Sequence, residues 1–124
     1  MNLEVEVKSN SFENWCAYKN GGKVLFETHS NSNKDDSGKN LFTSNAKLWA
    51  HSFWNKTETK IIEALVYWVE DLKNYLSPKK HQYYRGKTPN VNSYGQWIYD
   101  TEWILVPAVE IRRFLFKHYI TNDN

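Results

Sequence analysis

The most regular pattern of apolar and polar residues in this chain runs from Asn55 to Leu76. When residues are placed about 100° apart, as in an α-helix, most apolar side chains of this segment fall on one broad arc and most charged ones fall opposite. Asn55 followed by Glu58 resembles a capping box, and Pro78 disfavours helical geometry at Ser77. The pattern therefore predicts one long central helix with a wide buried face.

Two other segments alternate between apolar and polar residues. In residues 3–8 the apolar side chains alternate with charged ones, which predicts a strand whose charged side faces water. The segment 41–54 fits two periods, because alternate residues from Leu48 to Trp54 match a strand while three others match helical spacing (Ala46, Trp49, Phe53). We expect a strand that leads into the long helix.

An Asn-Gly-Gly sequence at positions 20–22 predicts a β-hairpin. Asn-Gly readily adopts the positive φ angles of a tight turn, and the flanking segments 12–18 and 23–29 would form the two strands. With this register Trp15 lies opposite Phe26 on the face that packs on the core. The segment that follows the hairpin, 30–40, has no apolar residue, so we expect it to be a mobile loop.

The last third of the chain predicts one or two strands and a second helix. Residues 96–106 are rich in the aromatic and β-branched types that suit strands. Pro107 then opens the segment 107–120, where proline at the first helical position costs no hydrogen bond. The expected fold is α+β: a small, mainly antiparallel β-sheet packed by one long central helix and a C-terminal helix, in a single domain spanning 1–124. Its core should include Leu65, Trp68 and Leu72, all on the long helix.

Composition limits the classes of protein to consider. With 124 residues the chain can bury a core without covalent staples. Its single cysteine, Cys16, excludes an intramolecular disulfide, and the start of the chain does not have the pattern of a signal peptide. No apolar stretch approaches the length of a membrane span. We therefore expect a cytoplasmic protein that does not enter a membrane.

The candidate catalytic residues lack the spacing that catalysis needs. The four histidines lie far apart in sequence and form no metal-binding motif (His29, His51, His81, His118). Ser93 has Val91 where a nucleophile elbow has glycine, and Cys16 has no basic neighbour in sequence to lower its pKa. We expect no enzyme activity, no metal and no cofactor.

Aromatic residues point instead to a protein partner. They make up 16% of the chain, and Trp and Tyr dominate the energetics of protein interfaces. On the predicted long helix Tyr67 lies on the polar arc between Glu63 and Glu70, and Asn74 continues that row. Phe116 belongs to a second apolar patch on the predicted C-terminal helix. We expect a non-catalytic protein that masks a functional surface of another protein, as small bacterial-type inhibitors, toxin-immunity proteins and antitoxins do; its own oligomeric state stays open.

Nucleic-acid binding is the alternative. The segment 79–87 interleaves cations with aromatic residues, which can neutralise phosphates and stack on bases. Its candidate contacts are Tyr83, Tyr84, Arg85 and Lys87, and Arg112 on the C-terminal helix could extend them. The net charge of +2 gives no general affinity for polyanions, so such binding would depend on this local cluster.

Overall fold

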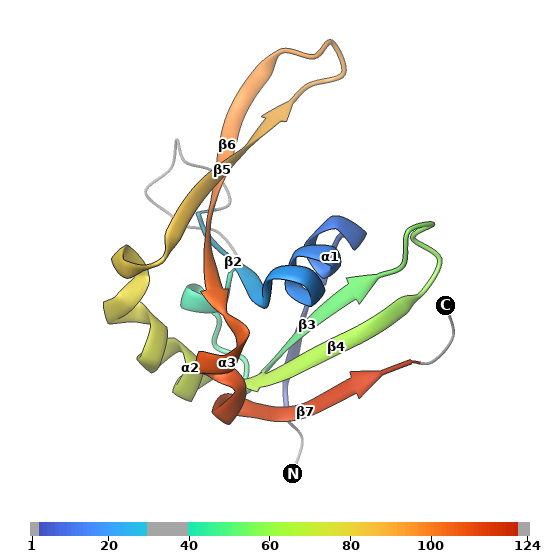
Figure 1. Ribbon diagram of the computed structural model, residues 1–124. Helices are drawn as coiled ribbons and strands as arrows, with labels where there is room; N and C mark the ends of the chain where they lie inside the picture. Colours follow the sequence, from blue (N-terminus) through green and yellow to red (C-terminus); the bar gives the residue numbers. More distant parts are fainter. Residues whose placement is uncertain (1–2, 30–39, 122–124) are drawn as a thin grey trace.

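The computed structural model describes residues 3–29 and 40–121, which form two β-sheets joined by short helices (Figure 1). The first sheet has four strands in the order β1-β3-β4-β7 (Val5–Asn10, Leu48–Trp54, Ile61–Trp68 and Leu115–Ile120). The second has three strands in the order β2-β6-β5 (Lys23–His29, Trp97–Pro107 and Tyr84–Val91). Strand β1 runs parallel to β3, and every other pair is antiparallel. The predicted α+β class and the mainly antiparallel pairing are thereby confirmed.

Three short α-helices and three 3-10 helices connect these strands. The α-helices are α1 (Phe12–Gly21), α2 (Val69–Leu76) and α3 (Ala108–Ile111). The 3-10 helices are η1 (Leu41–Thr43), η2 (Ser77–Gln82), which continues α2, and η3 (Arg112–Phe114), which continues α3. Apart from Asn40, the loop expected at 30–40 lies outside the described residues.

The prediction of one long central helix over 55–76 is wrong. Its first part is a turn, in which Glu58 has a φ of 56° and the Asn55 side chain accepts hydrogen bonds from the amides of Thr59 and Lys60. The next part is strand β4, which lies between β3 and β7 and is therefore covered by neighbours along both edges. A central strand can have a nearly continuous apolar sequence, which helical periodicity cannot distinguish from a buried helix. Only the last part, α2, is helical.

The predicted hairpin is half correct. Strand β2 forms as expected, but its proposed partner is helix α1. Ser11 caps this helix by accepting a hydrogen bond from the Asn14 amide, and Gly22, at a φ of 64°, ends it with its own amide bonded to the Tyr18 carbonyl. The two glycines after Asn20 therefore end a helix, with Gly22 as its C-cap, and do not form a hairpin turn.

The predicted C-terminal helix is limited to one short turn. Residues 108–111 form α3, whereas 115–120 form strand β7, which pairs antiparallel with β4. Phe, His, Tyr and Ile are all acceptable in strands, and the open edge of β4 offers this segment a row of backbone hydrogen bonds. Pairing with the edge of β4 thus makes residues 115–120 a strand, although their sequence pattern is compatible with either a helix or a strand.

The core lies between the two sheets and is closed by α2. Phe26 and Ile104 from the second sheet meet Phe53 and Leu65 from the first. Leu65 and Leu72 are buried as predicted, but Trp68 is 36% exposed. Beyond the core the ribbons of β5 and β6 continue as a two-stranded arm that projects from the body (Figure 1). Among the described residues no helix is long and apolar enough to cross a membrane.

Candidate functional site

Strand β1 has the predicted period but the opposite orientation. Val5 and Val7 are 46% and 61% exposed, whereas the charged residues between and after them turn toward the body. Lys8 pairs with Glu27 at 3.0 Å, and Ser44 donates a hydrogen bond to the Glu6 carboxylate at 2.7 Å. The prediction that the charged side faces water is therefore wrong, because partners on neighbouring segments hold those charges. Alternation predicts a strand but does not say which side is inside.

The valines of β1 belong to an apolar surface that we call the outer face. Register places Val7, Ala50 and Val66 side by side across three strands, and Val5 and Leu48 beside Trp68. Leu48, Ala50 and Val66 form a small buried cluster of their own, separate from the main core. Exposed apolar and aromatic side chains surround this cluster (Val5, Val7, Trp68, Phe116, Tyr119). Helix α1 and the three-stranded sheet lie on the other side of the four-stranded sheet (Figure 1).

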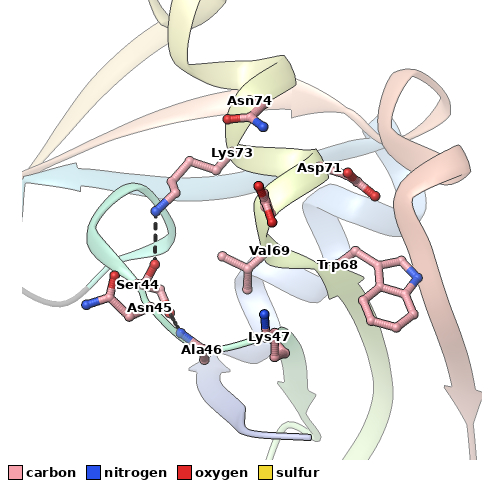
Figure 2. A pocket seen from close by; sticks show the side chains of 10 residues that line it. Ser44, Asn45, Ala46, Lys47, Trp68, Val69, Asp71, Lys73 and Asn74 are labelled. Atoms are coloured by element: carbon pink, nitrogen blue, oxygen red, sulfur yellow. Dashed lines mark hydrogen bonds between the residues drawn. The ribbon is translucent and has the colours of Figure 1, made fainter.

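Trp68 connects the outer face to a groove. Its ring meets that of Phe116 edge to face, with centroids 5.0 Å apart. The groove has a volume of about 490 Å³ and lies between residues 44–47 and the start of α2, with Trp68 at its side. Figure 2 shows Val69 between the loop and Trp68, and Lys73 reaching the Ser44 carbonyl at 3.0 Å. An exposed aromatic surface therefore continues into a concave one.

The groove carries charges of both signs. Lys47 and Lys73 line it together with the carboxylates of Glu70 and Asp71. Asn74 completes the lining on the helical side (Figure 2). The structure thus brings together three of the residues predicted to bind a partner: Glu70 and Asn74 in the groove and Phe116 beside Trp68.

Two other predicted contact residues are buried, so the expected exposed acidic strip does not exist. Glu63 and Tyr67 are 2% and 1% exposed, because β4 turns both toward the interior. The Glu63 carboxylate accepts hydrogen bonds from Trp15 and Lys19 and lies 2.6 Å from His118 Nε2. Burial alone would raise the Glu63 pKa, but the hydrogen bonds from Lys19, His118 and Trp15 outweigh it and hold the pKa below its ordinary value.

The predicted basic and aromatic contacts lie elsewhere, near the base of the arm. Tyr84, Arg85 and Lys87 are exposed on β5. Tyr83 is only half-buried, and its hydroxyl donates to Glu110 at 3.1 Å; desolvation and this carboxylate raise its pKa. Arg112 is at a third place, beside α1 and β7, and does not extend the basic cluster.

Sequence reasoning missed the residues that dominate the outer face. Trp68 was assigned to the core, and Val5 and Val7 to the inner side of a strand. Each assumption follows the rule that large apolar residues are inside, which has many exceptions at the surface. The available signal was the β-branched and aromatic content of 61–68, which favours a strand and would have put Val66 and Trp68 on one face.

No group of three or more His, Cys, Asp or Glu residues within 3–29 and 40–121 is arranged to hold a metal ion. No protein-family model, curated protein or solved structure matches the chain. Its function is therefore inferred from the chemistry of its surfaces.

Proposed function

We propose that this protein acts without catalysis by binding another protein through the outer face and the adjoining groove, and that it masks a functional surface of that partner. The observation that supports this proposal most directly is the uncovered apolar face around Trp68. Contiguous exposed apolar surface on a small domain is a common mark of a protein interaction site. Trp, Tyr and Phe at its edge are suited to act as anchors, since they bring a large contact area at low entropic cost.

Charge favours a different protein over a second copy of this chain. Lys117 is exposed on β7 next to Val66, and no carboxylate is placed on the outer face by the described strands. Two copies packed face to face would bring this cation against apolar side chains, which costs desolvation without a counter-charge. A partner with an apolar centre and an acidic group opposite Lys117 fits better, and its neighbouring charges could pair with Lys47 and Glu70 in the groove.

Site-specific crosslinking tests this surface. A photoreactive amino acid would replace Val7 or Phe116 in the full chain in its native host. Val109 is the control, because it is 70% exposed on α3 and lines a cavity with Leu65 and Tyr67 on the inner side of the sheet. We expect the same heterologous protein to be crosslinked from positions 7 and 116, but not from 109. A Trp68→Ala change should remove both crosslinks, and the purified partner should lose its own activity when the parent chain is added.

Three results would contradict the proposal. Crosslinks only between copies of the chain would identify the outer face as a homodimer interface. Equal crosslinking from position 109 would show that contact is nonspecific. A partner that keeps its full activity when saturated with the parent chain would contradict the masking role while leaving the contact intact.

Nucleic-acid binding remains the second candidate because the base of the arm gathers cations beside an aromatic ring. Lys80, Arg85 and Lys87 line a cavity of about 360 Å³ together with Trp103. Gly86 makes this possible, since a Cβ there would lie 2.1 Å from the Trp103 ring. Tyr84 packs near the same ring, with centroids 6.2 Å apart.

Salt dependence distinguishes this candidate. Single-stranded RNA or DNA held by these cations should lose affinity steeply as salt increases, because counterions are released on binding. Reversing the charges of Arg85 and Lys87 should abolish that binding but leave the crosslinks at positions 7 and 116 unchanged. If the parent retains no nucleic acid even at low salt, this second candidate is wrong.

A further inference from the structure

A separate cavity of about 420 Å³ lies on the inner side of the four-stranded sheet. Its walls come from the end of α1, from the inner face of β4 and β7, and from α3, which surround one region of the body in Figure 1. This volume is within the range of small-molecule sites, which are about 300–1,000 Å³. The cavity shares no lining residue with the groove beside Trp68.

The cavity is lined by apolar side chains and by cations. Leu65 and Leu115 supply apolar surface, as does the exposed Val109. Lys19, Arg112 and His118 supply nitrogen donors. A few polar groups beside apolar surface are typical of sites that bind small organic molecules.

The charges around the cavity do not balance within the described residues. Lys19 and His118 both contact the buried Glu63 carboxylate, at 2.9 and 2.6 Å. Arg112 lines the same cavity, and it has no carboxylate within ion-pair distance in the part of the chain that the structure describes. One cation therefore remains available at the mouth of the cavity.

One tyrosine supplies a further donor. Tyr67 lines the cavity while its side chain is almost completely buried, and none of the hydrogen bonds among the described residues uses its hydroxyl. Tyr18 lines the same cavity, but its hydroxyl interacts with the Glu63 carboxylate, which together with burial raises its pKa to about 12. The Tyr67 hydroxyl, whose pKa burial raises, keeps its proton at neutral pH and can donate it to an anion.

We infer that this cavity binds a small organic anion, in which a carboxylate or phosphate group is attached to a compact apolar body. The anionic group would pair with the Arg112 guanidinium, whose planar set of donors fits carboxylate and phosphate oxygens. The Tyr67 hydroxyl would donate to the same group. The apolar body would lie on Leu65 and Leu115. This inference is independent of the proposed protein partner.

The test is an NMR titration of the full chain with benzoate and with phenyl phosphate, and with benzyl alcohol as the neutral control. We expect saturable shifts of amide signals in residues 18–22 and 115–118 with at least one anion, and much weaker shifts with benzyl alcohol. Arg112→Gln should weaken anion binding about tenfold or more. Arg113→Gln is the matched control, because its guanidinium packs over the Tyr75 and Phe114 rings, and it should leave binding unchanged.

Tyr67→Phe sharpens the assignment, because it removes one hydroxyl and keeps the ring that the core needs. It should weaken anion binding about threefold while the amide spectrum of the free protein stays close to that of the parent. The inference is wrong if neither anion gives saturable shifts, if benzyl alcohol binds as well as benzoate, or if Arg112→Gln and Arg113→Gln have the same effect.

Discussion

On the inner face of the four-stranded sheet Glu63 and His51 are almost completely buried, whereas on the outer face Val7 and Tyr119 are about half exposed. The buried residues stand on the central strands β3 and β4 and the exposed ones on the edge strands β1 and β7 of the same sheet, so position within the sheet accounts for part of the difference. Glu63 is tolerated because Trp15 and Lys19 of the neighbouring helix α1 bind its carboxylate, whereas His51 accepts a hydrogen bond at Nδ1 from Trp49 of its own strand. Within 3–29 and 40–121 no second layer covers the outer side chains, and only those on the central strands, such as Ala50 and Val66, are buried by their neighbours in the sheet. Burial therefore depends both on neighbours within the sheet and on the elements that cover a face, and an apolar face without such cover is a reason to look for a partner.

The largest expected contrast comes from shortening one apolar side chain on each face. Leu65→Ala on the inner face should lower the free energy of unfolding by about 2–5 kcal/mol, because it leaves a cavity in the core. Val7→Ala on the outer face should change it by less than about 0.5 kcal/mol, since that side chain is already 61% exposed. Chemical denaturation of both variants measures the difference. Equal losses would show that the outer face is covered in the isolated chain.

Acid should destabilise the inner face through His51. Burial, with a smaller effect of Lys8, lowers the His51 pKa to about 3, so the folded state resists a proton that the unfolded state accepts below its ordinary pKa of 6.5. Stability should therefore fall as pH decreases from about 6.5 toward 3, with a slope of up to about 1.4 kcal/mol per pH unit. Denaturation midpoints across this range should show the slope in the parent and a smaller one in His51→Phe. An unchanged slope in the variant would place the titrating group elsewhere.

Replacing the buried carboxylate tests whether its partners explain its position. Glu63→Gln should lower the free energy of unfolding by about 1–3 kcal/mol at neutral pH, because Lys19 and His118 lose a charged acceptor. The Glu63 pKa is lowered in the folded state, so its stabilising contribution is present above the unfolded pKa of 4.5 and disappears as pH falls through the folded value. The parent and the variant should accordingly converge in acid. A constant difference at every pH would mean that packing and not charge is responsible.

The smallest effect concerns the aromatic pair on the outer face. Trp68→Ala and Phe116→Ala should each cost about 1 kcal/mol or less, with a coupling of about 0.5–1 kcal/mol between them because their rings meet edge to face. A double-mutant cycle in denaturant measures this coupling. Binding of the proposed partner should respond far more strongly than stability does. A large stability loss in Trp68→Ala would assign this residue to the core after all.

The sequence predicted several elements for physical reasons that the structure bears out. The alternation at 3–8, the residues at 48–54 and the aromatic and β-branched content at 97–106 all correspond to strands. Each has a local period or composition that suits an extended backbone whatever lies beside it. Leu65 and Leu72 are buried as predicted, although Leu65 belongs to strand β4 and not to the helix on which its burial was expected.

Some of the predicted contact residues are exposed and others are buried, and the difference follows from the element to which each belongs. Glu70 and Asn74 are exposed, as predicted, because α2 is the part of the long pattern that is truly helical. Glu63 and Tyr67 are buried because they belong to strand β4. Alternate residues of a strand lie on opposite sides, so both side chains lie on the inner side and not on the polar arc that a helix would have. They were predicted to contact a partner, but β4 does not expose their side chains to solvent.

What the sequence by itself determined is the class of fold and the residues able to form strands, since both follow from local periodicity and side-chain shape. What only the tertiary structure decided is which elements pair and which faces are covered. Residues 115–120 form a strand because they pair with the edge of β4. The charged side chains of β1 face the body because Lys8 pairs with Glu27 and Glu6 accepts a hydrogen bond from Ser44. Both results depend on backbone hydrogen bonds and ion pairs between segments that are distant in sequence. A local sequence pattern does not specify which distant segments will meet, so it cannot predict these interactions.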